Sequence, residues 1–213
     1  MLEVCRMKKV VLIIIILLVV ACSAPVKKAE YSGYLSDYSR LKESSTEKNY
    51  FSYRAENISN YTKFIIDPVE MLYQPNTNEK ELSKKELKDL QAYLHHNLVK
   101  ALTSGDDPLT IVDKAGDNVA RLRVAITQVK KTIGALNLTI YTKVTGVGLG
   151  GVSVEGELLD SITGEQVAAV IRWGSGSRVL RAGFKKTGDA EILLKKWSKE
   201  LKKKLSQNKS NEK

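Results

Sequence analysis

Cys22 is the residue of this chain whose type and position best suit a covalent reaction. It follows Lys8 and Lys9, an apolar segment from Val10 to Val20, and the small residue Ala21. This order of charged, apolar and small residues is typical of a secretory signal peptide with its cleavage site. A membrane-spanning helix is disfavoured, because the twelve residues from Val10 to Ala21 would form only about 18 Å of helix. A bilayer core is about 30 Å thick, so we expect cleavage between Ala21 and Cys22.

The stretch Val19-Val20-Ala21-Cys22 resembles the lipobox of bacterial lipoproteins. The resemblance implies that Cys22 is diacylated, becomes the first residue after cleavage and is then N-acylated. Ser23 follows the cysteine where an aspartate would favour retention at the inner membrane, so the resemblance implies an outer-membrane anchor that faces the periplasm. The inner membrane and the cell surface are alternatives. Residues 1–21 are thus interpreted as signal peptide and 22–30 as a lipidated tether, although Met7 would also serve as a start.

The two histidines lack the spacing of a metal site. His95 and His96 are adjacent on an expected helix, where neighbouring side chains point about 100° apart. A zinc site would need ligands three or four residues apart, with further ligands elsewhere. We therefore interpret both as surface or boundary residues, with His95 at the edge of the apolar face, and expect no metal site.

Acidic residues and glycines offer no better basis for catalysis or cofactor binding. Asp67 precedes a proline at the end of an expected strand, whereas Asp160 and Glu165 flank an expected turn. General acid–base catalysis needs carboxylates that converge in a pocket. Residues 146–151 fit G-x-G-x-x-G, but a strand pattern follows them where dinucleotide binding requires a helix. We expect a protein that is not an enzyme and has no cofactor, with a hydrolase of envelope polymers as an alternative.

Residues 63–205 predict one α/β domain, with a mixed sheet of about four or five strands and two main helices on one face. Apolar residues at helical spacing behind Ser83 and Glu86, which form a capping box, predict a helix over 83–103. A second helix is expected over 190–205, with a stripe of Leu194, Trp197, Leu201 and Leu205 surrounded by lysines. Strands are expected over 63–67, 119–130, 152–158 and 167–173, with a short one near 111–113. The third and fourth of these strands predict a hairpin with one core face.

The segments that flank this domain have no persistent period. Residues 31–62 hold six of the nine tyrosines, and we interpret them as an irregular arm whose rings dock on the domain. Residues 206–213 are polar and are expected to form a flexible basic tail.

Three ordered motifs resemble one protein family. They are Tyr31-Ser-Gly-Tyr-Leu-Ser-Asp-Tyr-Ser-Arg-Leu41, Phe64-Ile-Ile-Asp-Pro-Val69 and Glu157-Leu-Leu-Asp-Ser-Ile-Thr-Gly-Glu165. They are similar to the motifs of a bacterial lipoprotein family known as domain of unknown function 3313. The resemblance implies an envelope lipoprotein and no particular activity.

Charge restricts the classes of partner. The net charge is +10, of which the signal peptide contributes about +2, so the exported chain favours anionic partners. A solvated lysine surface is the simplest interpretation. Nucleic acid is an unsuitable partner for an exported lipoprotein, and no basic–aromatic pattern for it is present.

One segment, 132–151, is unusually apolar, with Lys143 as its one charged residue after Thr132. It could cover the sheet, pair with a partner or second copy, or enter lipid. The possible interaction surface comprises Leu136, Leu138, Ile140 and Val144, together with Trp197 of the last helix. The Trp197 side chain could pack against the sheet or bind a membrane surface, and packing is the favoured interpretation. We expect a non-enzymatic accessory module with a protein partner in the envelope, with an oligomeric secretion or pore subunit as the alternative.

Overall fold

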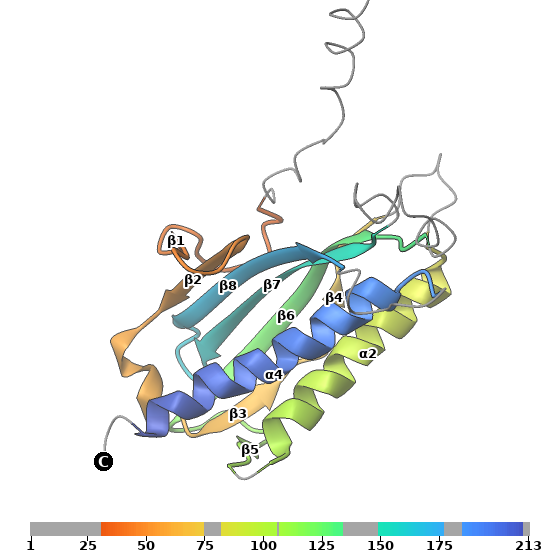
Figure 1. Ribbon diagram of the computed structural model, residues 1–213. Coiled ribbons are helices and arrows are strands. Elements are labelled where there is room, and N and C mark those ends of the chain that lie inside the picture. The colour runs from red at the N-terminus through yellow and green to blue at the C-terminus, as the bar shows by residue number, and fades with distance from the viewer. Residues whose placement is uncertain (1–30, 75–81, 106, 134–148, 177–184, 211–213) are drawn as a thin grey trace, which may run out of the picture. The chain divides into compact units, whose positions relative to one another are not determined.

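The computed structural model describes residues 31–74, 82–105, 107–133, 149–176 and 185–210, which belong to one compact unit (Figure 1). Their sheet is mixed and has eight strands, so the prediction of four or five was too low. The strands are β1 (Lys42–Glu43), β2 (Tyr50–Arg54), β3 (Lys63–Ile66), β4 (Glu70–Met71), β5 (Thr110–Ile111), β6 (Val119–Lys130), β7 (Gly151–Asp160) and β8 (Gln166–Ser175).

The three long strands β6, β7 and β8 form the antiparallel centre of the sheet, in the order β1-β2-β8-β7-β6-β3-β5. β3 and β5 pair in parallel on one side, and β4 pairs with β6 further along the same strand. Pro68 lies between β3 and β4, and a proline has no N–H to donate to the ladder. β3 and β4 are therefore two parts of one extended segment, and each part pairs with β6.

Residues 31–62, predicted to be irregular, include β1, β2 and a 3₁₀ helix η1 (Glu56–Asn60). β2 pairs antiparallel with β8 over five residues. This strand exists because the edge of β8 offers hydrogen-bonding groups, and that edge lies more than 100 residues away in sequence. The sequence pattern around β2 does not indicate a pairing partner so distant in the chain.

Two helices, α2 (Lys84–Thr103) and α4 (Gly188–Ser210), lie side by side on one face of the sheet, as predicted (Figure 1). The predicted capping box is present, since Ser83 Oγ accepts from the Glu86 amide at 3.2 Å and Glu86 Oε2 accepts from the Ser83 amide at 2.7 Å. Helix α4 runs to Ser210, so residues 206–210 continue the helix where a tail was predicted.

The hairpin β7–β8 turns its two apolar sets to opposite faces of the sheet. Ala168 and Val170 lie opposite Leu158 and Gly156 and face the helices, whereas Ala169 and Ile171 lie opposite Glu157 and Glu155. Paired residues share a face, so the prediction of one core face for this hairpin is wrong. Both faces are covered: the helices bury one, and the N-terminal arm binds the other.

The start of α4 is fixed to the ends of β6 and β7 by a buried carboxylate. Asp189 Oδ2 accepts hydrogen bonds from Thr132 Oγ1 at 3.0 Å and from the Gly150 amide at 2.7 Å. The carboxylate lies in the first turn of the helix, where the macrodipole favours a negative charge. These contacts set where α4 begins its course across the sheet.

Candidate functional site

Two glutamates on β7 lie beneath residues 31–41 of the arm and are almost completely buried. Glu155 is 1% exposed and Glu157 is 2% exposed. Burial of a carboxylate is costly unless hydrogen bonds and opposite charges compensate it. The surroundings of these two side chains are therefore the most informative polar arrangement among the described residues.

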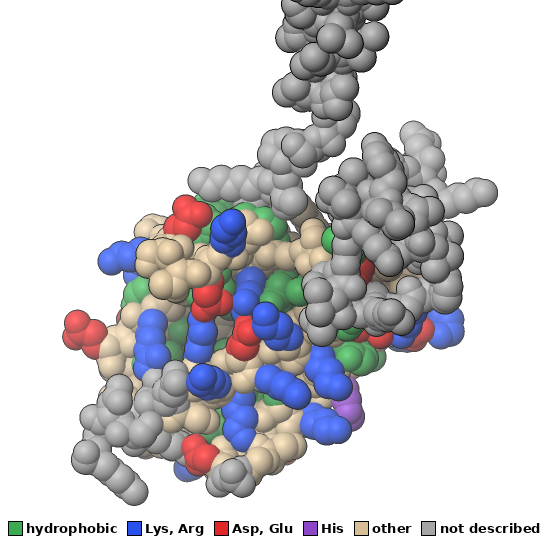
Figure 2. Space-filling model, in the orientation of Figure 1, with side chains coloured by type: hydrophobic (Ala, Val, Ile, Leu, Met, Phe, Trp, Pro, Cys, Tyr) green, Lys and Arg blue, Asp and Glu red, His purple; other side chains and the backbone are tan. Residues whose placement is uncertain are grey.

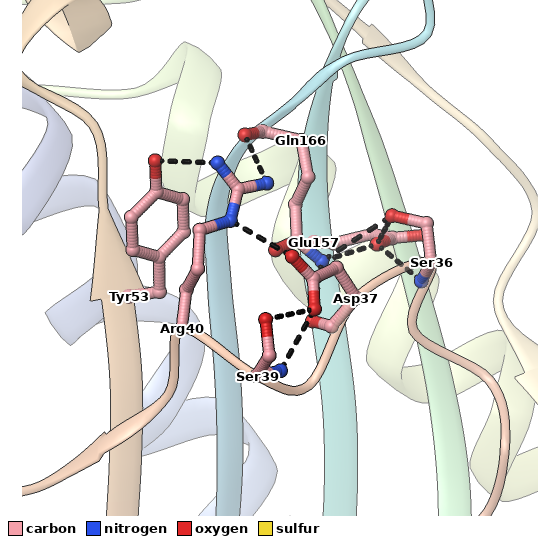
Figure 3. Close-up of polar contacts among 7 residues, drawn as sticks. All are labelled: Ser36, Asp37, Ser39, Arg40, Tyr53, Glu157 and Gln166. Atoms are coloured by element: carbon pink, nitrogen blue, oxygen red, sulfur yellow. Dashed lines mark hydrogen bonds and ion pairs between the residues drawn. The ribbon is translucent and has the colours of Figure 1, made fainter.

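Glu157 is held by four donors from three parts of the chain. Figure 3 shows those that come from Ser36 and Gln166. Its Oε2 accepts from the Ser36 amide at 2.9 Å, from Ser36 Oγ at 2.8 Å and from Gln166 Nε2 at 2.8 Å. Its Oε1 accepts from Arg123 Nη1 at 2.9 Å, which places a positive charge against the carboxylate. The same guanidinium lies 4.9 Å from the ring centre of Tyr34, a buried arm residue.

Glu155 holds the beginning of the arm. Its Oε1 accepts from the Ser32 amide at 2.9 Å, and its Oε2 accepts from the Tyr38 hydroxyl at 2.5 Å. Burial, followed by this hydrogen bond to Glu155, raises the pKa of Tyr38 above its ordinary value. Tyr31 stacks on Tyr38 with ring centres 4.6 Å apart. Tyr38 is thus docked on the domain, as the sequence analysis expected, whereas Tyr31 is 56% exposed and stacks on another arm residue.

The end of the arm forms a turn that Arg40 fastens to two strands (Figure 3). Arg40 Nε donates to Asp37 Oδ2 at 3.0 Å, Nη1 to the Tyr53 hydroxyl at 2.8 Å, and Nη2 to the Gln166 carbonyl at 3.1 Å. The Ser39 amide and hydroxyl both donate to Asp37 Oδ1 at 2.7 Å. These hydrogen bonds hold the pKa of the Asp37 carboxyl below its ordinary value.

We call this arrangement the arm clasp: the arm residues 31–41 with Glu155, Glu157, Arg123 and Gln166. Both carboxylates face the arm and accept from protein donors. An acid–base role would require a carboxylate that faces a substrate. The chemistry of the clasp is therefore retention of the arm on the sheet. Period-2 alternation marked both glutamates as sharing a face, but it did not indicate that the arm would bury them.

A second feature is the lysine-rich outer side of α4. Figure 2 shows basic side chains gathered over the helical face of the domain. Lys195, Lys199 and Lys203 are exposed and follow one another at four-residue spacing. The ion pairs that α4 makes within the described ranges use Glu191, Lys196, Glu200 and Lys204 instead. We call Lys195, Lys199 and Lys203 the basic stripe.

The residues predicted for the candidate site fall into two groups. Trp197 is 9% exposed and packs in the core cluster with Leu194 and Leu205, in agreement with the favoured packing interpretation. The others, Ala21, Cys22, Leu136, Leu138, Ile140 and Val144, lie outside the described residues.

The remaining polar candidates lie in separate places. Asp67 pairs with Arg121 at 2.7 Å, Asp160 caps the β7–β8 turn, and His95 is half-buried beside the exposed His96. Across the described ranges, no group of three or more His, Cys, Asp or Glu side chains is arranged to hold a metal ion. The helices in the same ranges include none long and apolar enough to span a bilayer.

Fold and site together define a single-sheet α/β domain to which its own N-terminal arm is clasped. The chain belongs to the family DUF3313, described as a protein of unknown function, whose model matches residues 30–201. The match confirms the family expected from the three motifs, and two of them, 31–41 and 157–165, supply the clasp and the turn beside it. Among curated proteins, none matches the chain at a significant level.

Several solved structures are distantly similar. The PelC dodecamer from Paraburkholderia phytofirmans shares 13% identity at a TM-score of 0.47, over 73% of this chain and 95% of that chain. A Xanthomonas campestris protein of family DUF330 shares 12% identity at a TM-score of 0.44, over 71% and 88%. A hypothetical protein from Chlamydia trachomatis shares 13% identity at a TM-score of 0.42, over 68% and 98%. Similarities at these identities and TM-scores support no conclusion about activity.

Proposed function

We propose that this protein is a lipid-anchored envelope module without enzymatic activity, which holds its domain near a membrane and presents α4 to an acidic partner. The anchor is Cys22, and the favoured location is the periplasmic side of the outer membrane. The arm clasp is the observation that carries the proposal. It attaches the arm at Ser32, ten residues after Cys22.

The clasp matters for an anchored protein because it limits how far the domain can move from the anchor. Ten residues of extended chain span at most about 36 Å. An arm that detached from the sheet would lengthen this tether by the residues between Ser32 and Arg40. Two buried carboxylates and Arg40 oppose that release, so the domain stays within one short tether of the lipid.

The basic stripe supports an acidic partner. The arm lies on one face of the sheet and the helices on the other, so the stripe is on the layer opposite the anchored arm. Exposed cations that are not used in the ion pairs of α4 attract an anionic surface and raise the rate of encounter. An acidic region of an envelope protein has the required charge.

Site-specific photocrosslinking in living cells tests this proposal. A photoreactive residue at Lys199 should give a discrete crosslinked partner, and the same residue at Ile162, which is 62% exposed on the β7–β8 turn, should not. Neutralising the stripe with Lys195→Gln, Lys199→Gln and Lys203→Gln should remove the product while membrane attachment persists. Equal crosslinking from Lys199 and Ile162, or an unchanged product in the neutralised variant, would refute the partner surface.

A further inference from the structure

The arm has a definite direction on the sheet. Its Ser32 amide bonds to Glu155, and four residues later its Ser36 amide bonds to Glu157. The arm therefore runs in the same direction as β7, which begins at Gly151 and ends at the turn to β8.

The later arm contacts follow the same course. Arg40 bonds to the Gln166 carbonyl, and Gln166 lies opposite Leu159, near the end of β7. Followed backward from Ser32, the chain therefore points to the end of the sheet where β7 begins. In the anchored protein that we propose, the tether to Cys22 leaves the domain at that end.

We call this part of the domain the exit end. Both helices begin there (Figure 1). The Thr132 amide donates to the Lys186 carbonyl, and Lys186 pairs with Glu86 at 3.1 Å. The Gly176 amide donates to the Gly150 carbonyl, and the β6–β7 ladder joins the two sets of contacts. Among the described residues, the exit end comprises 84–86, 130–133, 150–151, 174–176 and 185–189.

The exit end is positively charged. Six lysines and two acidic residues belong to it. Asp89 and Glu191, which pair with two of these lysines from outside, reduce the excess to two positive charges. Lys84 and Lys130 are exposed and take no part in the ion pairs among the described residues. Basic groups of this kind are attracted to an anionic lipid leaflet when they lie close to its surface.

Exposed apolar side chains are concentrated in the same half of the domain. Four large hydrophobic side chains of the described ranges are exposed. Ile133 belongs to the exit end, Tyr31 directly precedes the first arm contact, and Leu72 follows β4 beside the first half of β7. Ile162 lies on the β7–β8 turn at the opposite end. Apolar and tyrosine side chains beside lysines suit the interface of a bilayer.

The loops at the opposite end of the sheet are acidic. The β5–β6 loop and the β7–β8 turn contact each other through Gly116 and Ser161. Their charged residues are Asp113, Lys114, Asp117, Asp160 and Glu165. The basic stripe is an unsuitable alternative for the leaflet that holds the anchor, because the tether leaves from the arm on the other face of the sheet. Charge and tether direction thus both favour the exit end.

We propose that the exit end docks on the anionic phospholipid leaflet that holds the anchor, with the sheet standing away from it. This inference rests on the anchored role proposed above. The lysines contact lipid phosphates, and Ile133 and Tyr31 enter the interface. β7 has ten residues and spans roughly 33 Å, so the β7–β8 turn lies about that far from the leaflet. The α4 helix extends away from the membrane, and its basic stripe faces sideways.

Fluorescence quenching tests this orientation in the mature, acylated chain, reconstituted in vesicles of phosphatidylglycerol and phosphatidylcholine. A thiol-reactive fluorophore is attached at Ile133→Cys or at Ile162→Cys, because acylation blocks Cys22 and cleavage removes Cys5. Lipids spin-labelled on the headgroup should quench the label at position 133 several-fold more strongly than the label at position 162.

Charge variants test the chemistry of the lipid contact. Lys84→Gln combined with Lys130→Gln should weaken the quenching at position 133, because it removes the two unpaired cations. Lys114→Gln, in the acidic loops, is the matched control and should leave the quenching unchanged. Added salt should also weaken the quenching, because it screens charges at the surface. Unchanged quenching in the double variant would overturn the contact with anionic headgroups.

Mass spectrometry of the same preparation measures the acylation of Cys22. A chain without acyl groups would refute the proposed anchor and the orientation that rests on it. Acylated protein whose two labels are quenched equally, or more strongly at position 162, would overturn the orientation and leave the anchor intact. Lys130→Cys and Glu165→Cys provide a second pair of labels, and circular dichroism identifies the variants that remain folded.

Discussion

Glu157 is the residue on which the arm clasp depends most. Four donors converge on its carboxylate, and its side chain has no exposed surface. Glu157→Gln would leave Arg123 without its counter-charge and would turn one accepting oxygen into a donor. Breaking a buried ion pair typically costs about 3–5 kcal/mol. Since Arg123 is partly exposed, we expect a loss of about 2–4 kcal/mol in urea unfolding.

The exposed Glu165→Gln is the matched control and should change stability by less than about 0.5 kcal/mol. Limited proteolysis provides a second measurement, because a released arm should be cleaved faster at Arg40 and Lys42. Equal stability and equal cleavage of the two variants would mean that the clasp does not hold the arm.

Asp160 gives the β7–β8 turn a defined dependence on pH. Hydrogen bonds from the Thr163 amide, the Tyr61 hydroxyl and the Ile162 amide lower the pKa of its carboxyl below the ordinary value. A lowered native pKa stabilises the fold above the ordinary pKa, and this contribution disappears as the pH falls through the native pKa. Asp160→Asn should therefore flatten the decline in stability below about pH 4.

Urea unfolding at a series of pH values measures this effect. The variant should be less stable than the parent at neutral pH, and the difference should shrink on acidification. If the free energies of unfolding of the parent and of Asp160→Asn fall in parallel from pH 7 to about pH 2, Asp160 does not contribute to the acid sensitivity of the fold.

At the scale of elements, a substitution of Trp197 tests whether α4 packs on the sheet or binds a membrane surface. Its side chain is 9% exposed among core residues, with the Arg172 guanidinium 5.0 Å from its ring centre. Trp197→Ala should lower the free energy of unfolding by about 3–5 kcal/mol, as for other emptied aromatic sites. Ile162→Ala, at an exposed position, is the control. An unchanged melting temperature, with loss of binding to anionic vesicles, would assign the residue to membrane contact.

Elements that are encoded by a local sequence pattern were predicted well. The helix over 83–103 combines a capping box with leucines at helical spacing, and all the residues that report it lie within the helix and its cap. β1 and β4 are two residues long and have no period to detect, whereas β5 at Thr110–Ile111 overlaps the short strand expected near 111–113. β2 depends on the distant edge of β8. The missed strands are thus those whose existence depends on tertiary pairing.

The clasp was missed for a related reason. Alternation along β7 separates Glu155 and Glu157 from the apolar residues that face the helices, and this separation is correct. Alternation does not report what covers each face. The sequence analysis predicted only one core face for the hairpin, whereas arm residues more than 110 positions away bury the polar set as well.

At the scale of the whole molecule, the two faces of the sheet have different tasks. The arm face retains the segment that leads towards the proposed anchor at Cys22, and the helical face carries the basic stripe. In the proposed function, this division makes anchoring separable from docking: a substitution in α4 should leave membrane attachment intact. A substitution at the anchor should leave the fold intact.

Cys22→Ala tests the anchor. Acylation contributes roughly 0.8 kcal/mol per buried CH₂, and stable attachment requires more than one chain. The variant should therefore lose labelling by radioactive palmitate and should either leave the membrane fraction or retain its signal peptide. Glu157→Gln is the matched control, because it disturbs the clasp but should still be labelled and membrane-bound. Normal labelling and processing of Cys22→Ala would refute the lipobox, and with it the anchored role, while the partner surface would still be tested by photocrosslinking at Lys199.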